Sequence, residues 1–416
     1  MEGRLLLRDC ALCPPDGLVQ SGLSIVIEGA RVSAIGPSRQ LPTLPGDWEV
    51  ACAGRLVTMG FIDCHAHLVG RQLAPIGKGA DEASRSQQRR VLEEALTAAD
   101  VEVLTAFGIA RALRLGITLS VEHLHCPTDV ASALQRQATA VARIGARAVI
   151  THGSSSVEGS AAGLDQLGAN ALFAADFHNH DLIRPGLGFA SPDLCDDSFL
   201  KRLSQTSEEL GLAIHGELGQ GPADQAVTRL QSFGLLERNA AVAANSGDQL
   251  LALMQPKAPR LLPVLVPPHR SRHLQPTGKW EVLSTDRVGI GSGDRTLQDG
   301  WNWTFAQVGE AYLDQLGVRS PAKFGADLFG GPLDAVREGA LADLVVWDHV
   351  PSHENPGGVL PYLIERVVPS PAAWTIVNGR VVVREGRLLA HDYASLAQEA
   401  ATALNLLRRR ANIPSS

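Results

Sequence analysis

The central part of the chain alternates short apolar runs with longer segments of helical periodicity. The runs predict strands, and segments such as 105–115, 129–144 and 198–211 between them predict helices. The eight predicted strands are 61–64, 117–121, 146–150, 186–190, 212–214, 240–244, 261–266 and 288–290. Strands that alternate with helices are typical of parallel βα units. The pattern therefore predicts an α/β fold, a closed (β/α)8 TIM barrel with its chemistry at the carboxyl ends of the strands.

Both ends of the chain have a different texture, with short β-branched runs broken by Gly and Pro. Residues 4–8, 23–28 and 31–35 predict strands near the start, and 342–347 and a hairpin around Asn378-Gly379 predict strands near the end. We therefore expect one small composite β-sandwich domain built from both termini. The predicted boundaries are 1–56 for its N-terminal half, 57–339 for the barrel, 340–390 for its C-terminal half and 391–416 for a closing helix and tail.

Composition narrows the class of protein. The 416 residues are 45% hydrophobic, and a net charge of -7 offers no basic surface for nucleic acid. No apolar run approaches the roughly 20 residues of a membrane span, and the N-terminus lacks the apolar core of a secretory signal. Six scattered cysteines fit reduced thiols better than a disulfide framework. We expect a cytoplasmic protein that forms a homo-oligomer, a dimer, binds a small-molecule substrate or ligand, and binds neither nucleic acid nor membrane.

The first predicted strand of the central region ends in His65-Ala66-His67. Side chains at i and i+2 of a strand point to the same side, so two imidazoles could hold one divalent metal there. Imidazole is a good ligand for zinc, iron and nickel. A single His-X-His also arises by chance, so ligands on later strands are needed to distinguish a metal site from a coincidence.

Five segments spread along the chain carry motifs that occur together in one family. They are GFIDCHAH at 60–67, LRLGIT at 113–118, GLAIH at 211–215, EGALADLVVWD at 338–348 and IVNGRVV at 376–382. In these motifs the chain resembles the amidohydrolase superfamily, in the aminohydrolase branch related to guanine deaminases and triazine (atrazine) chlorohydrolases. The resemblance covers most of the chain and implies the same barrel and composite β domain.

The resemblance also implies a site and a reaction. Enzymes of this branch hold one divalent metal, zinc or iron, and His65, His67 and His215 match three of its ligands. A divalent metal lowers the pKa of bound water to about 7. The water attacks an electron-poor ring carbon while a carboxylate carries the proton to the leaving group.

Four positions depart from the family pattern, which predicts a degenerate active site. The family glutamate falls on Leu218, and Glu217 lies one place earlier, so we expect Glu217 to reach the site only if the chain bulges. The strand-eight aspartate falls on Gly293, with Asp294 displaced by one. Glu217 and Asp294 remain the candidates for proton transfer. Two histidines of the family pattern, on strands six and four, are replaced by Ala244 and Ala190.

Three residues are candidates for substrate contacts because they follow predicted strands. His125 could face the pocket after the second strand, or be an ordinary loop residue. His269 belongs to a basic segment that could meet an anionic group. Trp301 could form a wall for a planar ring, although aromatic residues more often serve packing.

Two functions remain open. The first is a metal-dependent hydrolase of carbon–nitrogen bonds, of the deaminase or aminohydrolase type, acting on small cyclic or amide substrates. The second is a catalytically silent pseudoenzyme that acts as a binding, scaffolding or regulatory subunit. A fold by itself does not fix function, so the site residues must decide between the two. The three retained histidines favour the first function, and the four departures favour the second.

Overall fold

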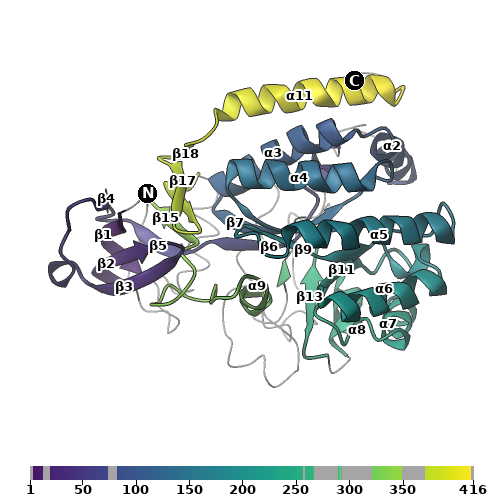
Figure 1. The fold of residues 1–416 in the computed structure, drawn as a ribbon, viewed down its shortest axis with the longest axis horizontal. Coiled ribbons are helices and arrows are strands. Elements are labelled where there is room, and N and C mark those ends of the chain that lie inside the picture. Colours follow the sequence, from purple (N-terminus) through teal and green to yellow (C-terminus); the bar gives the residue numbers. More distant parts are fainter. Residues whose placement is uncertain are drawn as a thin grey trace.

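The computed structural model describes residues 3–12, 19–73, 82–255, 258–266, 289–290, 292, 321–348 and 371–413. Figure 1 shows a central α/β region flanked by a sheet that carries the N-terminus and by the long C-terminal helix. Among the described residues, no helix is both long and apolar enough to cross a membrane.

The central strands form two parallel sheets. The first consists of β6 (Phe61–Ala66), β7 (Ile117–Leu124), β8 (Arg147–His152) and β9 (Ile183–Pro185). The second consists of β10 (Leu187–Phe189), β11 (Ile214–Glu217), β12 (Ala240–Ala244), β13 (Leu261–Leu265) and β14 (Gly289–Ile290). Every predicted central strand thus overlaps an observed one, but the strand predicted at 212–214 begins only at Ile214 and continues to Glu217.

The two parallel sheets lie against each other at both edges. Ser154 and Phe189 form an isolated parallel bridge, and β14 contacts β6, where the Ser292 backbone N–H donates to Asp63 at 3.1 Å. Within the described residues, strand hydrogen bonding does not close the two sheets into one barrel. The α/β fold is therefore confirmed, whereas the closed (β/α)8 barrel stays a prediction.

Helices connect the parallel strands and cover them. They are α1 (Gly70–Leu73), α2 (Glu82–Glu94), α3 (Ala98–Arg114), α4 (Val130–Ile144), α5 (Ser160–Phe177), α6 (Asp197–Leu210), α7 (Ala223–Ser232), α8 (Gly247–Met254) and α9 (Pro321–Phe329). Side-chain caps fix several starts, because they satisfy backbone N–H groups that lack a partner within the helix. Thr97 and Asp100 form a capping box on α3, and Asp196 caps α6 by accepting from the Phe199 N–H.

Strands from both ends of the chain share one nine-stranded sheet. Its members are β1 (Leu5–Leu12), β2 (Gln20–Glu28), β3 (Arg31–Pro37), β4 (Trp48–Ala51), β5 (Leu56–Met59), β15 (Leu344–Trp347), β16 (Trp374–Val377), β17 (Arg380–Arg384) and β18 (Arg387–Leu388). The two halves join where β5 pairs antiparallel with β15. A sandwich of two sheets is not confirmed, and the predicted domain boundaries stay predictions.

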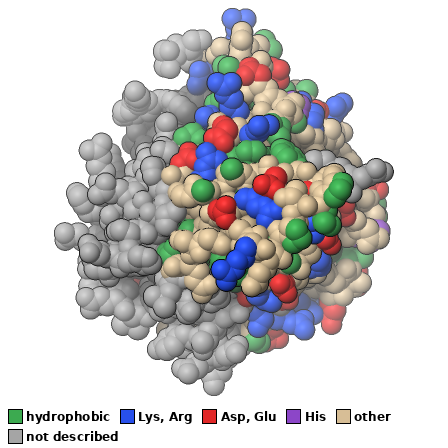
Figure 2. All heavy atoms as spheres, turned by 90° about the vertical axis from the view of Figure 1, so that its left-hand side faces the viewer, with side chains coloured by type: hydrophobic (Ala, Val, Ile, Leu, Met, Phe, Trp, Pro, Cys, Tyr) green, Lys and Arg blue, Asp and Glu red, His purple; other side chains and the backbone are tan. Residues whose placement is uncertain are grey.

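The predicted hairpin around Asn378-Gly379 joins β16 and β17. Both turn residues have positive φ, 52° and 72°, which is what a type I′ turn requires. A side chain on Gly379 would also meet the Gly29 carbonyl oxygen at 1.8 Å. Figure 2 shows the face of the molecule on the side of the nine-stranded sheet. Basic and acidic side chains are interspersed over the described part of this face.

The closing helix is α11 (Tyr393–Arg410), and Asp392 caps its start by accepting from the Ser395 N–H. It packs on α3, and an ion pair between Arg410 and Asp100 joins the two helices. Figure 1 shows α11 lying outside α3 and α4. Helix α11 lies within the segment 391–416 in which the sequence predicts a closing helix.

Candidate metal centre

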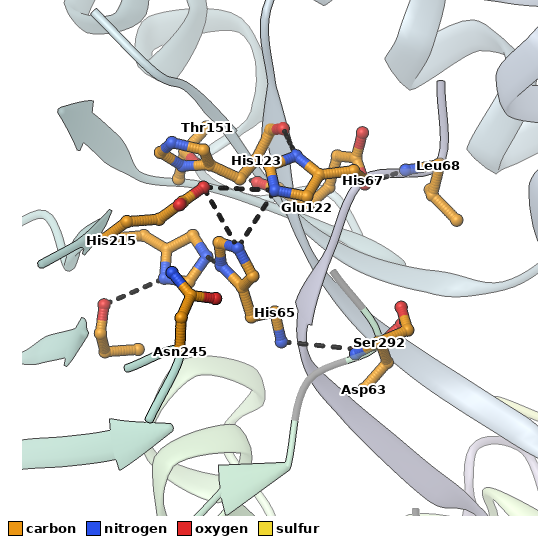
Figure 3. Close-up of polar contacts among 12 residues, drawn as sticks. Asp63, His65, His67, Leu68, Glu122, His123, Thr151, His215, Asn245 and Ser292 are labelled. Carbon is orange, nitrogen blue, oxygen red and sulfur yellow. Dashed lines mark hydrogen bonds and ion pairs between the residues drawn. The ribbon is translucent and has the colours of Figure 1, made fainter. Parts of the chain in front are cut away.

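Strand β6 brings His65 and His67 to one place. Both imidazoles are buried, and their Nε2 atoms lie 3.1 Å apart. Two nitrogens that bind one tetrahedral zinc at about 2.0–2.1 Å lie roughly 3.3 Å from each other. The strand spacing therefore gives this pair nearly the separation that a shared ion requires, and Figure 3 shows the two rings directly beside each other.

Strand β11 adds His215 and Glu217 from the other sheet. It pairs with β12 without a register shift, from Ile214 opposite Ala240 to Glu217 opposite Ala243. Regular alternation then puts Glu217 on the same side as His215, while Leu218 joins an apolar cluster. The expectation that Glu217 needs a bulge was wrong, because the strand itself extends through Glu217.

The Glu217 carboxylate lies between the two β6 histidines. Its Oε1 atom is 3.1 Å from His67 Nε2 and 3.3 Å from His65 Nε2. Among the described residues, His65, His67 and Glu217 form one group whose potential metal-binding atoms all lie within 4.8 Å of one another. His215 is not part of that group; its Nε2 lies 2.9 Å from His65 Nδ1.

Backbone carbonyls fix how two of these rings are protonated. His67 Nδ1 donates to the His123 carbonyl at 2.8 Å, and His215 Nδ1 donates to the Ala241 carbonyl at 2.9 Å. A neutral imidazole carries only one proton, so the Nε2 atoms of His67 and His215 expose lone pairs to the site. This is how the second hydrogen bond of a metal-binding histidine usually orients the ring.

The resulting cluster has more acceptors than donors. Two Nε2 lone pairs and the Glu217 carboxylate all face His65, which as a neutral ring has a single N–H to give. Burial lowers the pKa of His65, although the hydrogen bond with Glu217 opposes this shift, so a second proton is disfavoured. A divalent cation would satisfy the surplus acceptors, and the donor set of imidazoles and a carboxylate suits zinc or iron.

The charge states of His215 and Glu217 also suit metal binding. Burial and the neighbouring His65 hold the pKa of His215 well below its ordinary value. Burial alone would raise the pKa of Glu217, but hydrogen bonds with His65 and His67 lower it well below its ordinary value. The site therefore presents neutral imidazoles and an ionised carboxylate, the forms in which these residues bind metals.

A second histidine pair, at the end of β7, lies beside the first. His123 is fully buried, and its ring centroid is 5.4 Å from that of His65 and 5.2 Å from that of His215. His125 is half-buried, and its ring centroid lies 5.5 Å from that of His67. His125 therefore borders the cluster, and its predicted role in substrate contact stays a prediction. Sequence reasoning missed His123, although the repeated His-X-His spacing was a signal for it.

Other predicted site residues do not join the cluster. Ala244 is buried at the end of β12 and Ala190 follows β10, so neither position supplies an imidazole. Asp294, His269 and Trp301 lie outside the described residues, as does Gly293. Their predicted roles stay predictions.

Comparison with known proteins gives relatives of two kinds. No family model matches the chain. A 5-methylthioadenosine/S-adenosylhomocysteine deaminase from Desulforudis audaxviator is 24% identical over 95% of this chain and 97% of its own length. An imidazolonepropionase from Paracoccus denitrificans is 48% identical, but only over 13% of either chain. The likeness to the deaminase thus extends over the whole chain, and the likeness to imidazolonepropionase is local.

Solved structures share the fold over nearly the full length. An adenosine deaminase from Xanthomonas campestris with bound zinc superposes with a TM-score of 0.75 at 16% identity, covering 97% of this chain and 98% of that one. The atrazine chlorohydrolase of Arthrobacter aurescens TC1 in complex with zinc gives 0.70 at 15% identity, covering 96% and 100%. These likenesses show that the chain shares its fold with zinc-containing structures of an adenosine deaminase and an atrazine chlorohydrolase.

Proposed function

We propose that this protein is a metal-dependent hydrolase that removes an amino group from a small nitrogen heterocycle. The observation that carries the proposal is the position of the Glu217 carboxylate, 3.1 Å and 3.3 Å from the Nε2 atoms of His67 and His65. This position supports a role for Glu217 as the proton carrier, because its carboxylate lies directly beside the groups that would hold the metal. His65, His67 and His215 are the proposed ligands, with zinc as the first candidate because similar structures contain zinc.

The chemistry divides between the ion and the chain. A bound divalent ion supplies a water whose pKa falls to about 7. Glu217, as an ionised carboxylate, would accept a proton when water attacks the ring and would deliver it to the departing amine. The carbonyls of His123 and Ala241 hold the rings of His67 and His215 through Nδ1, so these two residues would bind the ion through Nε2.

The proposed substrates follow from the same site. Attack by water needs a ring carbon made electron-poor by neighbouring nitrogens, with an amino group as the leaving group. The whole-chain relative is named for deamination of adenine-containing compounds, and fold relatives include an adenosine deaminase and an atrazine chlorohydrolase. Adenine nucleosides and amino-substituted triazines are therefore the classes to assay first.

The test measures metal and ammonia on the same preparations. We expect purified protein from zinc-supplemented cells to contain at least one zinc per chain and to release ammonia from a member of these classes. Glu217→Gln should keep the zinc bound by the histidines but lose at least about 100-fold in kcat, the usual contribution of a positioned acid or base. Glu209→Gln on the exposed face of α6 is the matched control and should leave both measurements unchanged.

A catalytically silent role is the second candidate, and Ala244 favours it, because the family histidine of strand six is absent. If the protein is catalytically silent, we expect zinc to bind without ammonia release from any tested heterocycle. Glu217→Gln should then change neither the bound zinc nor the released ammonia. Loss of zinc in the His65→Ala variant would support the metal-dependent proposal, whereas a wild type that binds no zinc under any supplementation would refute it.

A further inference from the structure

The second histidine pair is not explained by a one-metal site. His123 is 0% exposed, yet neither of its ring nitrogens has a hydrogen-bond partner among the described residues. An unsatisfied buried polar atom costs about 1–3 kcal/mol. Most buried imidazoles avoid this cost by bonding to a neighbour, as His67 and His215 do here.

The surroundings of His123 make a bound cation the natural partner. Its ring lies among four other imidazoles, with centroids 4.8 Å away for His125 and 5.2–5.6 Å away for the remaining three. A neutral imidazole exposes one lone pair, which is the form that binds a divalent metal.

A carboxylate completes a set of three ligands. His123, His125 and Glu217 offer one atom each, and these atoms all lie within 4.8 Å of one another. Ligands bound to a common ion at about 2.0–2.2 Å lie up to roughly 4 Å apart. The three groups are therefore near coordination distance, and small side-chain movements would bring them to it.

The backbone keeps space free for this pair. Gly153, which follows β8, passes so close that an added Cβ would lie 2.6 Å from His123 Nε2 and 2.5 Å from His125 Cε1. Only a residue without a side chain allows the two rings to stay where they are. Gly153, in the loop after β8, thus leaves room for the two imidazole rings at the end of β7.

We propose that His123, His125 and Glu217 bind a second divalent transition metal, next to the ion held by His65, His67 and His215. Glu217 belongs to both groups of potential ligands, the one with His65 and His67 and the one with His123 and His125, and its carboxylate has two oxygens, so it can bridge two ions. This inference rests on the proposed metal-dependent function, and it changes the centre from one ion to two. A centre of this kind positions substrate and water between two positive charges.

The test counts ions. Metal-depleted full-length protein is reconstituted with zinc, passed through a desalting column and analysed for zinc and protein. We expect two zinc ions per chain in the wild type and one in the His123→Ala/His125→Ala double variant. His178→Ala, which removes an exposed histidine at the end of α5, is the control and should keep two.

A second measurement does not depend on counting. With cobalt in place of zinc, two ions that share the Glu217 carboxylate should couple magnetically, so the paramagnetic resonance signal per cobalt should be weaker in the wild type than in the double variant. Circular dichroism checks the fold, and His125→Asn, a change at the half-buried member, replaces the double variant if that one fails to fold.

Each outcome decides something. One zinc per chain in both wild type and variant overturns the second site and leaves the proposed function intact. Two zinc ions in both also overturn it, because the second ion then lies elsewhere. No zinc in the wild type overturns this inference together with the proposed function.

Discussion

At the scale of single residues, Glu122 has the clearest dependence on pH. It is fully buried on β7, accepts from the Leu68 N–H at 2.8 Å and from Gln137 Nε2 at 3.0 Å, and lies next to His123 in sequence. Burial raises its pKa from 4.5 to about 7 despite these hydrogen bonds. The folded protein therefore holds a proton that the unfolded chain releases between these two values, so this group costs stability as pH rises through that window.

Glu122→Gln removes this titration while keeping the shape of the side chain. Relative to wild type, the variant should gain roughly 2 kcal/mol of unfolding free energy between pH 5 and pH 8, since one pKa unit corresponds to about 1.4 kcal/mol. Urea unfolding of the metal-depleted protein at both pH values measures this difference. A stability difference that stays constant with pH would show that Glu122 ionises normally in the folded state.

At the scale of elements, the approach of β10 to β8 depends on a residue without a side chain. A Cβ on Gly188 would lie 2.1 Å from the His152 carbonyl oxygen, which is backbone and cannot rotate away. This contact lies where the two parallel sheets meet. The carboxyl ends of β8 and β10 thus approach each other closely at the junction of the two sheets.

Gly188→Ala should therefore destabilise the protein by about 1–3 kcal/mol or more, the usual cost of overpacking a core. Gly168→Ala in α5 is the matched control: nothing lies within 4 Å of its added Cβ, so it should be neutral or stabilising by up to about 1 kcal/mol. Thermal unfolding of the two variants tests the comparison, and equal melting temperatures would contradict this account of the sheet junction.

At the scale of the whole molecule, one buried ion pair ties the β sheet of the two ends to the parallel strands. Arg147 at the start of β8 donates to Asp343 at 2.7 Å and to the Asn378 side chain at 2.8 Å. Asp343 also accepts from the Asn378 backbone N–H at 2.8 Å. Both charges are buried, so each depends on the other for compensation.

Asp343→Ala should cost about 3–5 kcal/mol, because it leaves the Arg147 guanidinium buried without its counter-charge. Asp348→Ala, which removes the exposed partner of Arg55, should cost less than about 1 kcal/mol. Denaturant unfolding measures both. A cost for Asp343→Ala no larger than that for Asp348→Ala would mean that water reaches Arg147.

Local patterns were sufficient for much of the fold. Apolar runs locate the central strands, and the Asn378-Gly379 turn locates the C-terminal hairpin, because these signals depend only on neighbouring residues. The register at the end of β11 was harder to predict. Matching the family glutamate to Leu218 made Glu217 look misplaced, whereas one regular strand through His215 and Glu217 puts both side chains on the same side.

By itself, the sequence determined the α/β pattern, the β-rich ends and the His-X-His pair, because residue spacing along a strand decides which side chains share a face. Only the tertiary structure decided which strands lie opposite one another. It brought His215 and Glu217 within hydrogen-bonding distance of β6, and it left His123 buried among four imidazoles without a hydrogen-bond partner among the described residues. These contacts join residues about 150 positions apart in the chain, and no local pattern encodes a contact between strands of different sheets.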